Sequence, residues 1–163
     1  MNMINRNFVF ILIFVIFFSL KNYVQAAPFD ELPLLKKLND YKIGERRVLK
    51  ALKYESRGKY KKAQKLYSEA LKFLLLANKQ TPASPAIYFY LGFTSKKLKK
   101  LIDAELYYLV GIELDPNNTK INNHLGQLFL ETDRFAEAKK ILTVLKNCKC
   151  EDFEELQTLI EKN

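Results

Sequence analysis

Residues 85–118 read PAIYFYLGFTSKKLKKLIDAELYYLVGIELDPNN, and residues 119–152 read TKINNHLGQLFLETDRFAEAKKILTVLKNCKCED. The two stretches align without a gap, so that Leu91-Gly92 in the first corresponds to Leu125-Gly126 in the second, 34 residues later. A fixed period of this length is typical of stacked helix–turn–helix repeats. A glycine at the same place in both stretches predicts a close approach between two helices.

The two stretches resemble the tetratricopeptide-repeat family, whose pattern is a large residue, Leu-Gly, an aromatic residue, a turn, Ala, an aromatic residue and a closing Pro. The ending IELDPNN of the first stretch is close to the family consensus. In the second stretch Cys150 stands where the closing Pro is expected, and Asn122 replaces the large aromatic residue. The residues that define the repeats are Tyr88, Leu91, Gly92, Ala104, Tyr108, Pro116, Leu125, Gly126 and Ala138.

A degenerate unit, residues 44–84, precedes the two repeats. Its turn reads GKYKKA from Gly58, but its closing proline, Pro82, comes seven residues later than the pattern requires, which predicts a second helix about two turns longer. The extra turns contain the apolar run 73–77. We expect a helix over Leu32 to Ile43 to cover that run with the residues of one face, namely Leu35, Leu38 and Tyr41 or Lys42.

The expected fold is therefore all-α, with about eight helices. The resemblance implies a right-handed superhelix of about three helix–turn–helix units. An N-terminal segment and helix, residues 27–43, precede them, and a capping helix, residues 153–163, follows them. Asp152 and Glu155 have the spacing of a capping box before that last helix. A terminal repeat needs such a helix because its outer face has no neighbouring repeat.

The first 26 residues are predicted to be a cleaved signal peptide. A short positive start is followed by an apolar run from Phe8 to Leu20 and by Val24 and Ala26, which suit the −3 and −1 positions of a cleavage site. The alternative is an uncleaved signal anchor, but the run is shorter than the ~20 residues of a membrane-spanning helix. The expected location is therefore outside the inner membrane, in the periplasm.

Positive charge is concentrated in the first half of the chain. Residues 36–72 hold 13 lysines and arginines against 4 acidic residues, whereas residues 119–163 hold 7 against 8. For a secreted protein this balance favours an acidic partner or an anionic envelope surface over nucleic acid. The alternative interpretation is a solvated, lysine-rich helix face.

Catalytic motifs are not evident. The chain has one histidine, His124, with no cysteine or carboxylate four residues away on either side. A glycine-rich phosphate loop, a nucleophile elbow and a His-Glu-x-x-His zinc motif are all missing from the sequence. We therefore expect a protein that is not an enzyme and that needs no cofactor.

Cys148 and Cys150 leave three interpretations open. They could be two buried thiols in a tight turn, or a disulfide, which an oxidising compartment favours. They could also be part of a soft-metal site, although two thiolates are too few for a closed zinc site. A resemblance to small secreted bacterial repeat proteins with a Cys-x-Cys-Glu segment before the last helix implies no activity.

The family resemblance implies a scaffold that binds a protein or peptide in its concave groove. The partner is expected to be acidic with an apolar anchor. Alternative functions are a thiol- or soft-metal-handling envelope factor and an envelope-surface structural factor that uses the basic first half. A clamp for a peptide carboxylate is disfavoured because Phe89 and Phe93 make the centre of the groove aromatic, unless both rings pack against the neighbouring helix instead. The predicted groove residues are Val48, Leu52, Glu55, Phe89, Phe93, Lys96, Lys97, Asn123 and Gln127.

Overall fold

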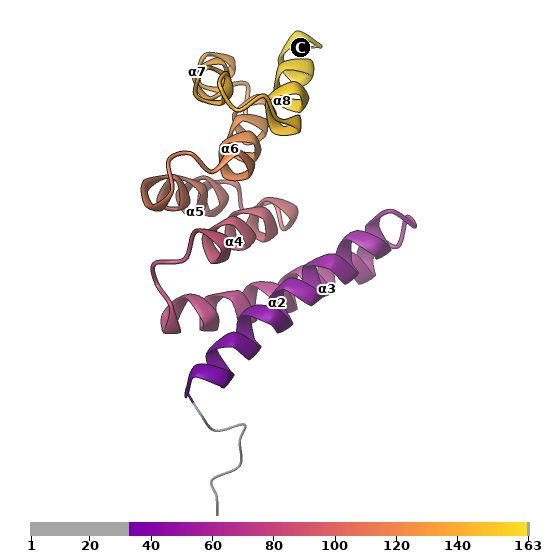
Figure 1. The fold of residues 1–163 in the computed structure, drawn as a ribbon. Helices are drawn as coiled ribbons and strands as arrows, with labels where there is room; N and C mark the ends of the chain where they lie inside the picture. The colour runs from indigo at the N-terminus through magenta and orange to yellow at the C-terminus, as the bar shows by residue number, and fades with distance from the viewer. Residues whose placement is uncertain (1–32, 163) are drawn as a thin grey trace, which may run out of the picture. The chain divides into compact units, whose positions relative to one another are not determined.

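The computed structural model describes residues 33–162, and it describes side-chain surroundings from residue 39 onward. The predicted signal peptide, residues 1–26, lies outside the described residues. The chain divides into two compact parts, residues 1–36 and 37–163. All side-chain packing described here lies within the second part. The helices are α2 (Pro33–Glu55), α3 (Tyr60–Gln80), α4 (Pro85–Lys97), α5 (Leu101–Leu114), α6 (Thr119–Glu131), α7 (Phe135–Leu145) and α8 (Glu151–Glu161), labelled in Figure 1.

The described residues contain these seven helices and no strand, so the expected all-α fold is confirmed. Within residues 33–162, each helix is too short or too polar to cross a membrane. Helix α4 packs against α3 and α5, and α6 packs against α5, α7 and α8. Val48 and Ala51 of α2 share a buried cluster with Tyr67 and Leu74 of α3. The same cluster contains Leu91 of α4, so it joins the first hairpin to the next helix.

Three turns between paired helices have the same geometry. The backbone N–H of Lys59, Lys100 and Arg134 donates to the carbonyl five residues earlier in each case. The residue before each donor has a positive φ: 68° at Gly58, 60° at Lys99 and 59° at Asp133. The last two lie 34 residues apart and the first two 41 apart, so the extra seven residues of the first unit follow its turn, as the late Pro82 indicated.

The N-terminal helix differs from the expectation. The predicted helix 32–43 and the first helix of the unit 44–84 are one continuous helix, α2 (Figure 1). Gly44 does not begin a helix. It is a contact point, because a Cβ there would come within 2.8 Å of Leu74 Cγ on α3. Both helices of the first hairpin are therefore long, and glycine allows them to approach in the extended part.

The apolar run 73–77 is only half covered. Leu74 and Ala77 are fully buried, and Tyr41 packs against their cluster as expected. Leu75 and Leu76 are exposed, by 42% and 48%, because they lie on the face of α3 that no described helix contacts. The side-chain surroundings of Leu35 and Leu38 lie outside the described part.

The C-terminal helix covers the last repeat but begins earlier than expected. Helix α8 starts at Glu151, and Cys150, not Asp152, is its N-cap residue. The Asp152 carboxylate instead accepts a hydrogen bond from Thr119 Oγ1 on α6 at 2.6 Å. Leu156 is fully buried against Gly126, where a Cβ would meet Leu156 Cδ2 at 2.5 Å. The glycine that recurs in the two repeats therefore does place helices in close contact at this position.

Candidate functional site

The first helices of the three units enclose an open cavity of about 230 Å³. Its walls are mostly apolar and aromatic. Four of its residues, Val48, Leu52, Phe89 and Phe93, were predicted from sequence to line a groove, and the structure brings them together. The complete lining is Val48, Leu49 and Leu52 from α2, Phe89, Tyr90 and Phe93 from α4, and Lys120 and His124 from α6.

Aromatic rings form the centre of this cavity. The Phe89 ring lies 5.2 Å from the Tyr90 ring and 6.1 Å from the Phe93 ring, measured between centroids. Both phenylalanines are half-buried, and each also packs against one of the two core clusters. Both interpretations of these rings, groove wall and core packing, therefore hold. Each phenylalanine packs against a core cluster and also lines the cavity.

His124 forms part of the floor. Its ring lies 5.2 Å from that of Phe89 and 5.5 Å from that of Phe93, and its Nδ1 is buried without a hydrogen-bond partner among the described residues. Burial lowers the pKa of His124 to about 4, and the nearby Lys96 ammonium adds to this while Asp152 opposes it. The imidazole is therefore neutral at pH 7 and presents a mainly apolar surface.

We expect His124 to make the fold acid-sensitive. An unfolded histidine has a pKa near 6.5, so the folded state binds its proton less well, and stability should be complete above about pH 6.5 and decline toward pH 4. The loss from this group is at most about 3 kcal/mol. Urea unfolding of His124→Phe at pH 7 and pH 4.5 should show a smaller decline than the native chain. Equal declines would contradict a buried neutral imidazole.

The lysines expected to face an acidic ligand are already paired. Lys97 Nζ lies 2.9 Å from Glu55, which also accepts a hydrogen bond from Tyr67 at 2.6 Å. Burial raises the pKa of Glu55, but the hydrogen bonds from Tyr67 and Lys97 outweigh it, so the pKa is lowered and the carboxylate is ionised. Lys96 is 9% exposed and pairs with Glu131 at 2.8 Å. These charges stabilise the walls and offer little to a ligand.

Lys120 supplies positive charge to the cavity instead. Its ammonium lies 5.6 Å from the Phe89 ring centroid, it is exposed, and it forms no ion pair within residues 39–162. Lys120 and His124 are four residues apart and face the same side of α6. Neither residue was among the groove residues predicted from the sequence. Their shared helical face was the signal that could have found them.

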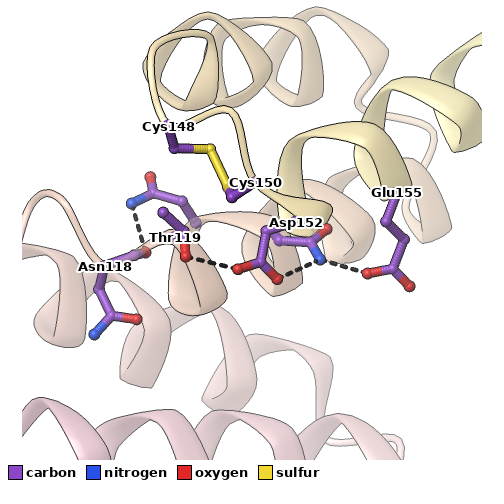
Figure 2. Close-up of a disulfide and its surroundings, with 8 residues drawn as sticks. Asn118, Thr119, Cys148, Cys150, Asp152 and Glu155 are labelled. Atoms are coloured by element: carbon purple, nitrogen blue, oxygen red, sulfur yellow. Dashed lines mark hydrogen bonds between the residues drawn. A yellow bond between two sulfur atoms is a disulfide. The ribbon is translucent and has the colours of Figure 1, made fainter.

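The polar groove residues of the last unit lie elsewhere. Asn123 is fully buried and donates to Asp152 at 3.2 Å and to Glu155, both on α8 (Figure 2 labels the two acids). Gln127 donates to Asn123 Oδ1 at 3.1 Å and lines a second cavity beside Leu130. In this structure Asn123 therefore anchors the capping helix.

Cys148 and Cys150 form a disulfide with an S–S distance of 2.05 Å, in the turn between α7 and α8 (Figure 2). Of the three sequence interpretations, the structure therefore has the disulfide. Within the described part of the chain, the histidines, cysteines and acids do not form a group of three that could hold a metal ion.

Comparison with known proteins finds no matching family model and no matching curated protein. Solved structures do match. The Arabidopsis OM64 TPR domain is 18% identical, with a TM-score of 0.52 over 76% of this chain and 98% of that domain. The second TPR domain of human RPAP3, in complex with the HSP70 peptide SGPTIEEVD, is 19% identical, with a TM-score of 0.54 over 78% and 99%.

A third match is the Yersinia enterocolitica type III secretion chaperone SycD in complex with a peptide of the translocator YopD. It is 19% identical, with a TM-score of 0.54 over 72% of this chain and 86% of SycD. At such low identities the likeness concerns the fold, and it agrees with the repeat period, the three matching turns and the close-packed glycines. The chain therefore has the tetratricopeptide-repeat fold.

Proposed function

We propose that this protein is a scaffold that holds a peptide segment of a partner protein in the cavity between α2, α4 and α6. The observation that carries the proposal is the cavity itself, in which half-buried aromatic rings lie beside Lys120, a cation that forms no ion pair with the described residues. The RPAP3 and SycD structures, each bound to a peptide, support it by analogy of fold.

The cavity suits a side chain better than a free small molecule. Its volume of about 230 Å³ is below the roughly 300–1,000 Å³ of small-molecule sites. Phe89, Phe93 and Leu52 offer a surface for one large apolar side chain, and aromatic residues in a concave centre are frequent hot spots. An acidic residue beside that anchor would reach Lys120. The proposed ligand is therefore a segment with an aromatic or large aliphatic residue flanked by an acid.

Peptide display on the purified chain tests this specificity. Selected peptides should share an apolar anchor with an acidic neighbour. Lys120→Glu should remove the acidic preference and weaken the selected peptides by about 1 kcal/mol, with a reduced salt dependence, because one attractive charge becomes repulsive. Lys139→Glu, an exposed change on α7, is the matched control. Selection of peptides without a shared anchor would contradict the proposal.

The same proposal places the protein outside the inner membrane, released by cleavage after Ala26. The apolar run from Phe8 to Leu20 and the small residues after it support export. A disulfide between Cys148 and Cys150 is in keeping with an oxidising compartment.

A second candidate role is contact with an anionic surface through the tip of the α2–α3 hairpin. Tyr60 is 65% exposed there, among cations that are exposed and form no ion pair in the described part of the chain. Aromatic and basic residues together are typical of segments that lie at a lipid headgroup surface. The cations are Lys53, Arg57, Lys59, Lys61, Lys62 and Lys65.

Vesicle sedimentation tests this second role. Binding to phosphatidylglycerol vesicles at low salt should fall sharply in Lys59→Glu with Lys61→Glu, since each basic residue near an anionic surface contributes about 1 kcal/mol. The pair Lys139→Glu and Lys140→Glu on α7 changes the net charge equally and should bind like the native chain. Absence of binding at low salt would rule the role out.

A further inference from the structure

The disulfide between α7 and α8 encloses a single residue, Lys149. Lys149 has a φ of 47°, in the left-handed region that residues with a Cβ adopt at an energetic cost. In the chain-entropy account, stabilisation by a disulfide grows with the length of the loop it closes, and this loop is among the shortest possible. The bond therefore contributes little to holding the chain folded.

Other contacts already hold α8 in place. Thr119 and Asn123 of α6 both donate to Asp152, and Leu156 is fully buried against Gly126. Figure 2 shows the disulfide beside this hydrogen-bonded group, separate from it. Because the capping helix does not depend on the bond, a reaction at the sulfurs can proceed without unfolding the last repeat.

The Cys148 side chain lines a cavity of about 240 Å³, and both cysteines are partly exposed. The cavity has an apolar side, Val144 and Leu145, and a polar side formed by Asn117, Thr119, Asn122 and Asn147. Asn122 and Thr119 hydrogen-bond within the protein, and the exposed amides of Asn117 and Asn147 can hydrogen-bond an extended backbone. A segment of another protein that carries a cysteine can therefore rest against the sulfur of Cys148.

We propose that Cys148 and Cys150 form a thiol–disulfide exchange site that takes protein dithiols as substrates. This activity is separate from peptide binding in the cavity between α2, α4 and α6, which lies on other residues. Reactive disulfides are those that are accessible and strained, and the enclosed left-handed Lys149 and the adjoining cavity meet both conditions.

In the first step a substrate thiolate attacks Cys148 Sγ, a new S–S bond forms, and Cys150 leaves as a thiolate. Cys150 is the N-cap residue of α8, where the helix dipole favours a negative charge, although Glu151, Asp152 and Glu154 in the first turn act against it. The second substrate thiolate then attacks the substrate sulfur and releases Cys148. The substrate's two thiols become a disulfide, and its two protons and two electrons pass to Cys148 and Cys150. A small-molecule disulfide, such as oxidised glutathione, restores the bond.

The experiment follows oxidation of a reduced two-cysteine peptide in oxidised glutathione, with the purified chain in catalytic amount. The native chain should accelerate oxidation on the order of tenfold over glutathione alone. Cys148→Ser with Cys150→Ser should lose the acceleration. Val144→Trp, which fills the cavity, should lose most of it, whereas Ile102→Trp, a change at an exposed position of α5 outside this cavity, should keep it.

A free oxidised peptide with the sequence NCKCE of residues 147–151 is the second control. If the native chain is no faster than this peptide, or if Val144→Trp is as fast as Ile102→Trp with both variants folded by melting curve, the proposal is overturned. Peptide binding by the groove is scored separately, so failure here leaves that function unaffected.

Discussion

Replacing Gly92 with leucine should strongly destabilise this protein. A Cβ at position 92 would come within 2.5 Å of Cδ1 and Cε1 of Tyr108. The Tyr108 ring is fully buried in the core cluster formed by α5 and α6 and is rigid, so it cannot yield as a flexible side chain would. Overpacking of this kind costs about 1–3 kcal/mol, and a leucine against a buried ring belongs at the upper end or beyond.

Urea unfolding at pH 7 measures the effect, with two comparisons. Ala136→Leu, an exposed change on α7, should leave stability almost unchanged. Gly126→Leu should cost less than Gly92→Leu, because the clashing atoms are the methyl groups of Leu156, at the end of a flexible side chain on the terminal helix. Equal stability of Gly92→Leu and the native chain would mean that α4 and α5 are not packed through this glycine.

Much of this fold could be predicted because the repeat is local in sequence. The period of 34 and the late Pro82 indicate where helices begin and end. Helix α4 begins after the N-cap Ser84, whose side chain accepts a hydrogen bond from Ile87 N–H. The continuity of α2 could not be predicted in this way. A glycine such as Gly44 is compatible with a helix start or with a helix contact, and only Leu74, 30 residues away, decides between them.

In the candidate site, too, the local features could be predicted and the contacts between distant residues could not. Helical spacing placed Phe89 and Phe93 on one face, and the structure keeps them there. Which charges remain available could not be predicted, because Lys97 pairs with Glu55 across 42 residues. Lys120 forms no ion pair among the residues that the structure describes, for the same tertiary reason. The partner of a charge depends on which helices stack, and a single sequence does not show this.

Loss of both groove rings should abolish peptide binding. Phe89→Ala with Phe93→Ala removes the aromatic wall of the cavity and leaves Leu52 and His124 without their main apolar neighbours there. Buried aromatic hot spots contribute about 2–4 kcal/mol to binding when truncated, which is roughly a 30- to 1,000-fold loss of affinity. Melting temperature should fall only moderately, because the fully buried Leu91, Ala104 and Tyr108 are unchanged.

A second variant tests the same cavity in case the double variant does not fold. Leu49 lines the same cavity but is 55% exposed, so Leu49→Glu removes apolar surface and adds a negative charge without disturbing the core. Leu106→Ala with Leu109→Ala, two exposed residues of α5 outside the cavity, is the matched control.

The most direct measurement is the affinity of a display-selected peptide for these four proteins by isothermal titration calorimetry. The native chain and the α5 control should bind the peptide with full affinity. The phenylalanine double variant should lose at least about 30-fold in affinity, and Leu49→Glu should show a clear loss. Full affinity in a folded double variant and in Leu49→Glu, or loss of affinity in the α5 control alone, would show that the cavity between α2, α4 and α6 is not the binding site.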